Sequence, residues 1–562
     1  MKASDLVVQT LIEAGIKRVF TLPGMGITWF LDSFRKRSKQ IEVVLARSEQ
    51  VASIMAQVAG RLTGKPGVFM GQGPWVATTG AFGILEAFFS GSPMLILTET
   101  SDYDGLGQYG VYQTMTGDYG AADIQSTLRG ITKFCTYATE PQDAVYGTQL
   151  ALKHASLPRR GPAAVIMKTT IIKREVTVNP KVKLYPTYGY LSYTPARPDQ
   201  GAIDTLAGYL NKARYPVIVA GHGAVEADIG KKLQNLASSV GCAVATSYNG
   251  KGVIDETSEI AVGMLGTWGC PTANRILKAA DLIIILGASM GPDYTRFRDP
   301  TMIRPGDQIL VQVDHDPRNS GWVYPVNLAI TGDVGDVIDY LNQCRLDRTK
   351  KQDRIQWIDN IKKATNYYTP PSLPSAPGSL HNTDVVGILQ SFLSSNDILT
   401  LDAGSNRIWA THNLRIKHPH QLLMPGGIGG MGWGGPAAAA AQMIYPNKRV
   451  TSLAGDGGFL MTIDVVATCV QHNLPVTFIV SNNQGLGMVR DNQGNQRIAT
   501  DFGYVDFAKI AEGMGARGMS VDTRDGLEDA LYESHKNIGP AVINVSIDPE
   551  ASYLPASDSA PL

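Results

Sequence analysis

The stretch from residue 449 to residue 483 constrains the fold of this chain most strongly. Residues 449–454 are a short apolar run typical of a buried strand, and the glycine-rich turn 455–458 follows at once. Apolar positions at helical spacing then predict a helix over 462–472, and residues 475–480 predict a second strand. A strand, a helix and a strand in this order form a parallel pair, so this part of the chain is predicted to belong to an open α/β sheet.

Two polar residues stand directly after these predicted strands. Asp456 follows the first and Asn483 follows the second, so both are expected at the carboxyl edge of the sheet, where open α/β sheets bind ligands. A carboxylate, an amide oxygen and one backbone carbonyl supply half of the octahedral oxygen shell that Mg²⁺ prefers. Such an ion takes its other ligands from phosphates and water, and the N–H groups of Gly457 and Gly458 can bind those phosphates. Either motif alone is more often an ordinary turn or loop, but their spacing within one strand–helix–strand unit favours a binding site.

This pair of motifs, Gly-Asp-Gly and then Asn-Asn a little under thirty residues later, resembles the motif of thiamine-diphosphate-dependent enzymes. Nearly the whole chain is similar to the acetohydroxyacid (acetolactate) synthase branch of that superfamily, which includes benzaldehyde lyase and oxalyl-CoA decarboxylase. The resemblance implies thiamine diphosphate and Mg²⁺ as cofactors, with Asp456, Asn483 and the carbonyl of Gly485 as metal ligands. The residues expected to contact the cofactor are Gly24, Gly404, Ser405, Gly429, Met431, Gly455, Gly457, Gly458 and Met488.

Strands and helices alternate along three stretches of the chain, and with the resemblance this predicts an α/β fold of three doubly wound parallel-sheet domains. We place a pyrimidine-binding domain at 1–178, a central domain of the FAD or nucleotide type at 195–345, and a diphosphate-binding domain at 378–550. The segments between these domains are rich in proline, and the second one also begins with many charged residues. Both are therefore predicted to be linkers.

Glu49 is the first candidate catalytic residue. It follows a predicted strand at 41–45 and begins a predicted helix, where a carboxylate is usually present only because it interacts favourably with the helix dipole. In the resembled family the corresponding motif is His-Glu-Gln, and its glutamate hydrogen-bonds N1′ of the cofactor's aminopyrimidine. This chain has Ser48-Glu49-Gln50, which keeps the glutamate and lacks the histidine.

The resemblance also implies an active-site glutamine before Lys133. Gln113 fits this place only if the chain carries an insertion of about seven residues, and without the insertion Gly120 takes the place. Both alignments stay open at the level of the sequence, and Gln113 is the second candidate catalytic residue.

The glycine-rich run 426–432 resembles the family motif Gly-Gly-Leu-Gly-Thr-Met-Gly. The resemblance implies that the carbonyl of Gly429 accepts a hydrogen bond from the 4′-amino group of the pyrimidine. It also implies that Met431 separates the two rings of the cofactor and imposes a V shape on it. A lone buried methionine is otherwise ordinary core filler.

The predicted central domain carries further family motifs at 220–223, 263–266 and 313–317. In the synthases this domain holds FAD, and in the acyl-CoA relatives it holds ADP or the CoA nucleotide. A domain that has lost its ligand is equally compatible with these residues. After Leu286-Gly287-Ala288 the synthases carry an arginine that contacts flavin, whereas this chain has Ser289. We therefore expect weak or absent flavin binding, with a nucleotide as an open alternative.

The sequence leaves the substrate open. The synthases prefer 2-ketobutyrate as acceptor through a tryptophan four residues after the methionine of Gly-Met-Val; here Gly487-Met488-Val489 is intact, but Asn492 stands at that place. We expect a lyase or carboligase of the acetolactate synthase type that acts on a 2-keto acid such as pyruvate, or on an acyloin. The alternatives are a lyase similar to benzaldehyde lyase or the 2-hydroxyacyl-CoA lyases, a 2-keto acid decarboxylase, and a catalytically silent cofactor-binding paralogue. Glu49, Asp456 and Asn483 are all present, which favours an enzyme.

Composition argues against several other classes of protein. Lys+Arg and Asp+Glu each number 50, so the formal net charge is zero and nothing indicates a nucleic-acid partner. The first residues do not form a signal peptide, no apolar run has the length of a membrane span, and the five scattered cysteines lack metal or disulfide spacing. We expect a cytoplasmic protein. The resemblance further implies a homodimer or homotetramer with active sites shared between chains.

Overall fold

The computed structural model describes residues 1–562 except 103–112, 119, 178–183, 370, 537 and 557–562. It contains three six-stranded sheets in which every paired strand is parallel to its neighbours, so the predicted α/β fold with three parallel sheets is confirmed. The chain separates into two compact units. The first compact unit comprises Met1–Thr194, Pro425–Asn447 and Thr462–Leu474, and the second comprises Pro195–Met424, Lys448–Met461 and Pro475–Leu562.

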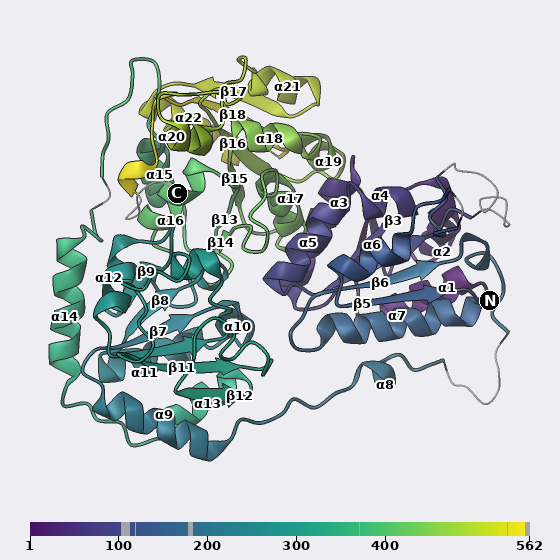
Figure 1. Ribbon diagram of the computed structural model, residues 1–562. Helices are drawn as coiled ribbons and strands as arrows, with labels where there is room; N and C mark the ends of the chain where they lie inside the picture. Colours follow the sequence, from purple (N-terminus) through teal and green to yellow (C-terminus); the bar gives the residue numbers. More distant parts are fainter. Residues whose placement is uncertain (103–112, 119, 178–183, 370, 537, 557–562) are drawn as a thin grey trace. The chain divides into compact units, whose positions relative to one another are not determined.

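The first sheet has the strand order β2-β1-β3-β4-β6-β5. Its strands are β1 (Arg18–Leu22), β2 (Glu42–Leu45), β3 (Gly67–Gly71), β4 (Met94–Glu99), β5 (Phe134–Ala138) and β6 (Pro162–Met167). Helices cover both faces (Figure 1), and they include α1 (Ala3–Glu13), α2 (Thr28–Lys36), α3 (Glu49–Thr63), α4 (Gly73–Ala77), α5 (Ala81–Ser90), α6 (Ile124–Ile131) and α7 (Pro141–Ser156). Because both faces are covered, the central strands are buried along their whole length and read as continuous apolar runs.

Helix α3 lies unusually close to this sheet. A Cβ atom at Gly67 would lie 1.8 Å from the carbonyl oxygen of Ala56, and one at Gly60 would lie 1.9 Å from the carbonyl oxygen of Pro93. The helix also packs against α5 and against α17 (Gly434–Ile444), which contains five consecutive alanines at 437–441. Small side chains on α3 and α17 let these helices approach each other, and this packing brings residues 425–447 into the first compact unit.

The second sheet has the order β12-β11-β10-β7-β8-β9. Its strands are β7 (Pro216–Ala220), β8 (Ala243–Thr246), β9 (Ala261–Met264), β10 (Leu282–Leu286), β11 (Ile309–Asp314) and β12 (Leu328–Thr331). Its helices include α9 (Gln200–Lys212), α11 (Gly230–Val240), α12 (Pro271–Ala279) and α13 (Val334–Leu341). Helices and strands together bury one continuous aliphatic core.

The predicted second linker is partly helical, with α14 spanning Lys351–Ala364. The buried guanidinium of Arg354 donates to the carbonyl oxygens of Val240 at 2.8 Å, Leu210 at 3.1 Å and Ala213 at 2.6 Å. These carbonyls belong to the ends of α9 and α11, where the last carbonyls have no partner within the helix. The charges of this segment therefore stabilise the second sheet domain as well as connecting it to the next.

The third sheet has the order β14-β13-β15-β16-β18-β17. Its strands are β13 (Ile398–Leu401), β14 (Leu422–Leu423), β15 (Val450–Gly455), β16 (Val476–Asn482), β17 (Arg517–Val521) and β18 (Ala541–Ser546). The helices of the second compact unit here include α15 (Asn382–Phe392), α16 (Ser405–Asn413), α20 (Gly487–Gln493), α21 (Phe507–Gly513) and α22 (Arg524–His535). The helix expected over 462–472 is found in a shorter form as α19 (Val465–Gln471), and a further helix, α18 (Asp456–Met461), precedes it. Helix α18 was not expected from the sequence because Gly457 and Gly458 are poor helix formers.

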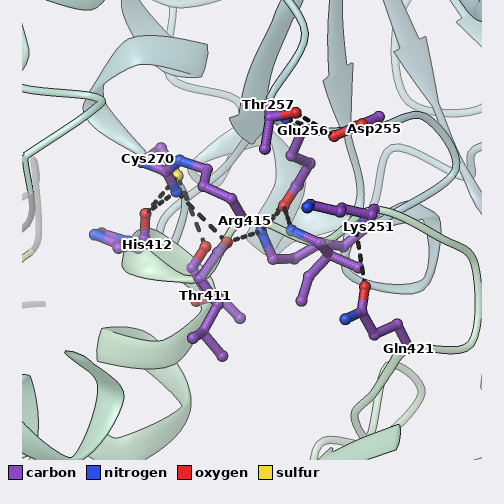
Figure 2. A network of polar contacts seen from close by, with 12 residues as sticks. Lys251, Asp255, Glu256, Thr257, Cys270, Thr411, His412, Arg415 and Gln421 are labelled. Carbon is purple, nitrogen blue, oxygen red and sulfur yellow. Dashed lines mark hydrogen bonds and ion pairs between the residues drawn. The ribbon is translucent and has the colours of Figure 1, made fainter. Parts of the chain in front are cut away.

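A buried ion pair joins the second and third sheet domains within the second compact unit (Figure 2). The ammonium group of Lys251 lies 2.6 and 2.9 Å from the carboxylate oxygens of Glu256, and these side chains are only 1% and 2% exposed. Lys251 also donates to the carbonyl oxygen of Leu414 at 3.1 Å, and Glu256 accepts from the N–H of Ile416 at 2.9 Å. The pair therefore fixes the chain just after α16 to the second sheet domain.

We predict that Glu256→Ala lowers the apparent free energy of unfolding by about 3–5 kcal/mol, because Lys251 then remains buried without its counter-charge. Chemical denaturation followed by circular dichroism measures the change. The double variant Lys251→Met/Glu256→Leu serves as the control and should lose less, since it removes both charges and keeps apolar volume. A double variant that is at least as unstable as Glu256→Ala would contradict this account.

Within the described residues, no helix combines the length and the apolar character that a membrane crossing requires.

Candidate active site

The predicted neighbours Asp456 and Asn483 lie at one edge of the third sheet. Strands β15 and β16 pair in parallel, with Gly455 opposite Ser481. Asp456 is the residue after β15, and Asn483 is the residue after β16, so both stand at the carboxyl ends of adjacent strands. The sequence prediction of their adjacency follows directly from this register.

Hydrogen bonds from the backbone hold the carboxylate of Asp456. One oxygen accepts from the N–H of Gly457 at 2.8 Å, and the other accepts from the N–H of Gly485 at 3.0 Å. Burial raises the pKa of Asp456, while these amide hydrogen bonds and Arg490 act in the opposite direction. The contact with Gly485 joins the loops after β15 and β16 into one structure.

Arg490 on α20 braces the loop that carries Asn483. Its guanidinium donates to the carbonyl oxygens of Asn483 at 3.0 Å and Gln484 at 2.6 Å, and its Nε donates to Asp501 at 2.7 Å. A Cβ atom at Gly485 would lie 2.2 Å from the guanidinium, so only glycine fits beneath it. Arg490 therefore fixes Asn483 through its backbone carbonyl.

Ser405 and Asn483 converge on the start of α20. A Cβ atom at Gly487 would lie 2.9 Å from Nδ2 of Asn483 and 3.2 Å from Oγ of Ser405. Ser405 is the first residue of α16, and Gly404 before it has φ +127°, a conformation that L side chains rarely adopt. The turns after β13, β15 and β16 thus place small or polar residues side by side, with Met488 half-buried next to them against the third-sheet core.

Glu49 is the first residue of α3, just beyond β2 at the carboxyl edge of the first sheet. Ser48 caps the helix by accepting from the N–H of Val51 at 3.3 Å. The carboxylate of Glu49 accepts from the hydroxyl of Thr79 at 3.3 Å. Ser48, which stands where the family has histidine, therefore acts locally as a helix cap.

Gln72, which was not selected from the sequence, connects Gln113 to Gly24. The side-chain amide of Gln72 donates to Oε1 of Gln113 at 3.0 Å and to Oγ of Ser101 at 3.4 Å. A Cβ atom at Gly24 would lie 2.0 Å from Oε1 of Gln72. Gln72 follows β3 and is flanked by glycines. Its position directly after a central strand is the sequence feature by which it could have been selected as a site residue. A polar cluster of Gly24, Gln72, Ser101 and Gln113 results at the same edge as Glu49.

The loop with Gly429 and Met431 belongs to the first compact unit. Gly429 has φ +65°, and Met431 is half-buried. At the end of the loop the indole of Trp433 is fully buried and donates to Oε1 of Gln57 on α3 at 2.9 Å. Helices of the first sheet domain thus hold a loop that follows β14 in the sequence.

Three stretches of the chain match parts of one enzyme family. Residues 1–122 match the N-terminal TPP binding domain of thiamine pyrophosphate enzymes, residues 203–341 match their central domain, and residues 402–545 match their C-terminal TPP binding domain. The chain belongs to the thiamine pyrophosphate enzymes.

Curated relatives place the chain in the acetolactate synthase branch of this family. It is 28% identical to the acetolactate synthase isozyme 1 large subunit of Escherichia coli over 98% of this chain and 95% of the relative. It is 26% identical to the acetolactate synthase of Bacillus subtilis over 100% of this chain and 95% of the relative. The mitochondrial acetolactate synthase catalytic subunit of Saccharomyces cerevisiae is 28% identical over 97% of this chain and 81% of that protein.

The donors at the third sheet suit the magnesium and diphosphate of such an enzyme. The described residues contain no group of three or more His, Cys, Asp or Glu side chains that could hold a metal by themselves. One carboxylate, one amide and one carbonyl instead suit Mg²⁺, which binds proteins through one or two carboxylates and takes phosphate and water as its other ligands. A Cβ atom at Gly455 would meet nothing within 4 Å, so space is open beside Asp456.

The glycine motifs in the central domain of this thiamine pyrophosphate enzyme take part in packing within the chain. The glycines after β7 and β10 approach each other, and a Cβ atom at Gly221 would lie 2.3 Å from the carbonyl oxygen of Gly287. These glycines are therefore explained by contacts within the chain. Ser289, at the place where the synthases have arginine, is an exposed residue with a short neutral side chain.

We predict that Asp456→Ala abolishes retention of thiamine diphosphate, because the metal expected to link the protein to the diphosphate would lose its only charged protein ligand. Isothermal titration with thiamine diphosphate in the presence of MgCl₂ measures the affinity. Asp529→Ala removes an exposed carboxylate from α22 in the same compact unit and should bind as the parent does. Equal affinity of the Asp456→Ala variant and the parent would contradict the assignment.

Proposed function

We propose that this protein is a thiamine-diphosphate-dependent carboligase of the acetolactate synthase type that acts on 2-keto acids such as pyruvate. The observation that carries the proposal is the placement of Asp456 and Asn483 after two adjacent parallel strands, with Gly485 bonded to the Asp456 carboxylate. The acetolactate synthase names of the relatives support the substrate class.

Asp456, Asn483 and the carbonyl of Gly485 are proposed to bind Mg²⁺. The carbonyl of Gly485 accepts from the N–H of Gly487 at 3.1 Å, and a carbonyl oxygen has a second lone pair for a metal. The diphosphate is proposed to contact Gly404, Ser405, Gly455, Gly457 and Gly458. Bound thiamine diphosphate would supply an electron sink for the bond that breaks next to the keto group.

Glu49 is proposed to hydrogen-bond N1′ of the aminopyrimidine and to hold the proton there. Thr79 donates to one of its oxygens and so fixes the direction of the carboxylate. The carbonyl of Gly429 is proposed to accept from the 4′-amino group, and Met431 and Met488 are proposed to support the bent cofactor. The chain itself then needs no nucleophile, since its residues position the cofactor and exclude water.

Gln113 is proposed as the polar residue that faces the substrate, with Gln72 holding it in place. A 2-keto acid offers a carboxylate and a carbonyl oxygen, and a side-chain amide can donate to either. Gln72 donates to Oε1 of Gln113, which leaves the amide nitrogen of Gln113 as the group to meet an acceptor.

The proposed reaction breaks one carbon–carbon bond and forms another. One pyruvate loses its carboxylate carbon as CO₂, its remaining acetyl unit bonds to the keto carbon of a second pyruvate, and that keto oxygen takes up one proton. No electrons are gained or lost overall, so the reaction needs no flavin.

We propose that the chain has three functional domains, at 1–178, 195–345 and 378–550. The central one, 195–345, is proposed to have a structural role. All five cysteines are free thiols, which supports our proposal of a cytoplasmic enzyme.

Asn492 is proposed to let the acceptor site take pyruvate and 2-ketobutyrate about equally well. Its amide oxygen accepts from the hydroxyl of Tyr553 at 3.1 Å, which holds this short side chain in place. Without a large indole, the additional methyl group of 2-ketobutyrate gains little contact area, which is worth only about 1–3 kcal/mol even in a well-formed pocket.

We expect purified protein with thiamine diphosphate and MgCl₂ to convert pyruvate into 2-acetolactate and CO₂. Mass spectrometry of the products measures this, with Glu49→Gln as the inactive control. With equal pyruvate and 2-ketobutyrate, the two acetohydroxy acids should form in similar amounts, and Asn492→Trp should shift the ratio toward the 2-ketobutyrate product. Bound cofactor without turnover of any 2-keto acid or acyloin would refute the proposed reaction, and a strong native preference for 2-ketobutyrate would refute the role of Asn492.

We also propose that the active enzyme is a homo-oligomer whose smallest active form is a dimer with two shared sites. The support is the family relationship together with the separation of Glu49 and Asp456 into different compact units of one chain. Two-fold symmetry would then generate two equivalent sites.

Subunit exchange tests this arrangement. We predict that mixing inactive Glu49→Gln with inactive Asp456→Ala restores about a quarter of the parent activity, since half of the random dimers are mixed and each mixed dimer has one intact site of two. Mass spectrometry of the intact dimers verifies the exchange. Confirmed exchange with no recovery would show that each site is built within a single chain.

A further inference from the structure

Glu86 makes an unusual set of contacts in the first compact unit. It lies on α5, its side chain is fully buried, and it does not follow any strand. Its two carboxylate oxygens accept from the N–H groups of Gly427 and Ile428, each at 2.8 Å. The N–H of Gly429 also favours the charged form of this carboxylate and so lowers its pKa. Successive amides of one loop therefore face one buried carboxylate, which is the arrangement of a backbone anion nest.

The face of α5 fits this loop closely. A Cβ atom at Gly427 would lie 2.7 Å from the carbonyl oxygen of Glu86 and 2.9 Å from its Oε2. A Cβ atom at Gly430 would lie 2.5 Å from the ring of Phe82, which is one helical turn before Glu86. Glycines at both positions are thus required by α5, and the loop cannot slide along the helix without losing this fit.

The carboxylate of Glu86 can carry a charge, which distinguishes it from the neutral side chains that hydrogen-bond the loop. Burial raises the pKa of Glu86, whereas the three loop amides and the nearby Arg61 favour its charged form. Two neutral hydrogen bonds hold the other end of the loop: Trp433 donates to Gln57 at 2.9 Å, and the hydroxyl of Thr462 donates to the carbonyl of Gly432 at 2.8 Å. Hydrogen bonds to a charged acceptor are about twice as strong as neutral ones, so Glu86 dominates the start of the loop.

The Glu86 contacts also differ from those of Glu99, another buried carboxylate of the first sheet domain. Glu99 accepts from the N–H of Gly73 at 3.2 Å and from the hydroxyl of Thr169, and both partners belong to neighbouring turns of its own sheet. Glu86 instead bonds a loop that is more than 300 residues away in the sequence and that comes from the third sheet domain.

We infer that Glu86 is a positioning residue for the aminopyrimidine of the cofactor: it holds residues 427–429 in the conformation in which the Gly429 carbonyl can accept the 4′-amino group. This inference rests on the proposed function of the loop. Glu86 occupies N–H groups of residues 427–429, so the carbonyl groups of these residues remain for the ligand. Preorganisation by a helix of the first sheet domain lowers the ordering cost that the pyrimidine would otherwise meet on binding.

Glu86→Gln tests the inference with almost no change in shape. The amide retains one acceptor oxygen but turns an N–H group toward a loop N–H group, so at least one charged hydrogen bond is lost. We expect the affinity for thiamine diphosphate with MgCl₂ to fall about 10-fold or more. The affinity for inorganic pyrophosphate with MgCl₂, which needs only the diphosphate half of the site, should stay within about twofold. Isothermal titration measures both affinities on the full-length protein.

Controls separate positioning from stability. Glu140→Gln changes an exposed carboxylate of the same compact unit, which lies 3.6 Å from Arg174, and should leave both affinities unchanged. Gly427→Ala disturbs the same contact from the loop side and should reproduce the selective loss, which keeps the test open if Glu86→Gln folds poorly. Phe82→Leu provides a third perturbation of the same face.

Two outcomes would overturn the inference: unchanged thiamine diphosphate affinity in Glu86→Gln, or an equal loss of affinity for thiamine diphosphate and pyrophosphate together with a lowered unfolding temperature. The second outcome would mean that Glu86 only stabilises the fold. A parent protein that binds neither ligand would refute the proposed function itself, and is thereby distinguished from failure of this inference.

Discussion

The parallel pairing of β15 with β16 is the constraint on which the rest of the site depends. Parallel strands end at the same edge of a sheet, so residues that follow them meet without any help from side-chain packing. Gly455 lies opposite Ser481, and this register sets the places of Asp456 and Asn483. The hydrogen bond between the Asp456 carboxylate and the Gly485 N–H then joins the two loops. A change of register would separate these donors whatever their identity.

Buried charges position the segments that carry functional residues. Lys251 and Glu256 fix the chain after α16, the helix that begins with Ser405. Arg490 fixes the loop of Asn483, and Glu86 fixes the loop of Gly429. In each case a buried charged side chain bonds to backbone groups of a loop. Because an unsatisfied buried charge is costly, such contacts admit few alternative loop conformations.

The two groups of proposed site residues, at the third sheet and at the first sheet, differ in how the chain brings them together. At the third sheet, the proposed metal ligands come from consecutive turns, and their contacts are mostly local in sequence. At the first sheet, Gly24, Gln72 and Gln113 come from turns that are well separated in sequence, and Gln72 lies at their centre. Substrate choice is proposed to depend on this second cluster and on Asn492, where the chain departs from the synthases. Such a division would allow substrate choice to change while cofactor binding is retained.

The sequence by itself determined the α/β class, the three parallel sheets and the adjacency of Asp456 with Asn483, because alternating apolar strands and helices and the order of turns are local properties. Glu49 was selected through its resemblance to the family's His-Glu-Gln motif, and the structure places it at the start of α3. Only the tertiary structure brought Gln72 to Gln113 and attached the Gly427–Gly429 loop to Glu86. These features depend on contacts between residues far apart in the chain, and no local pattern specifies which buried glutamate or glutamine will meet a distant loop.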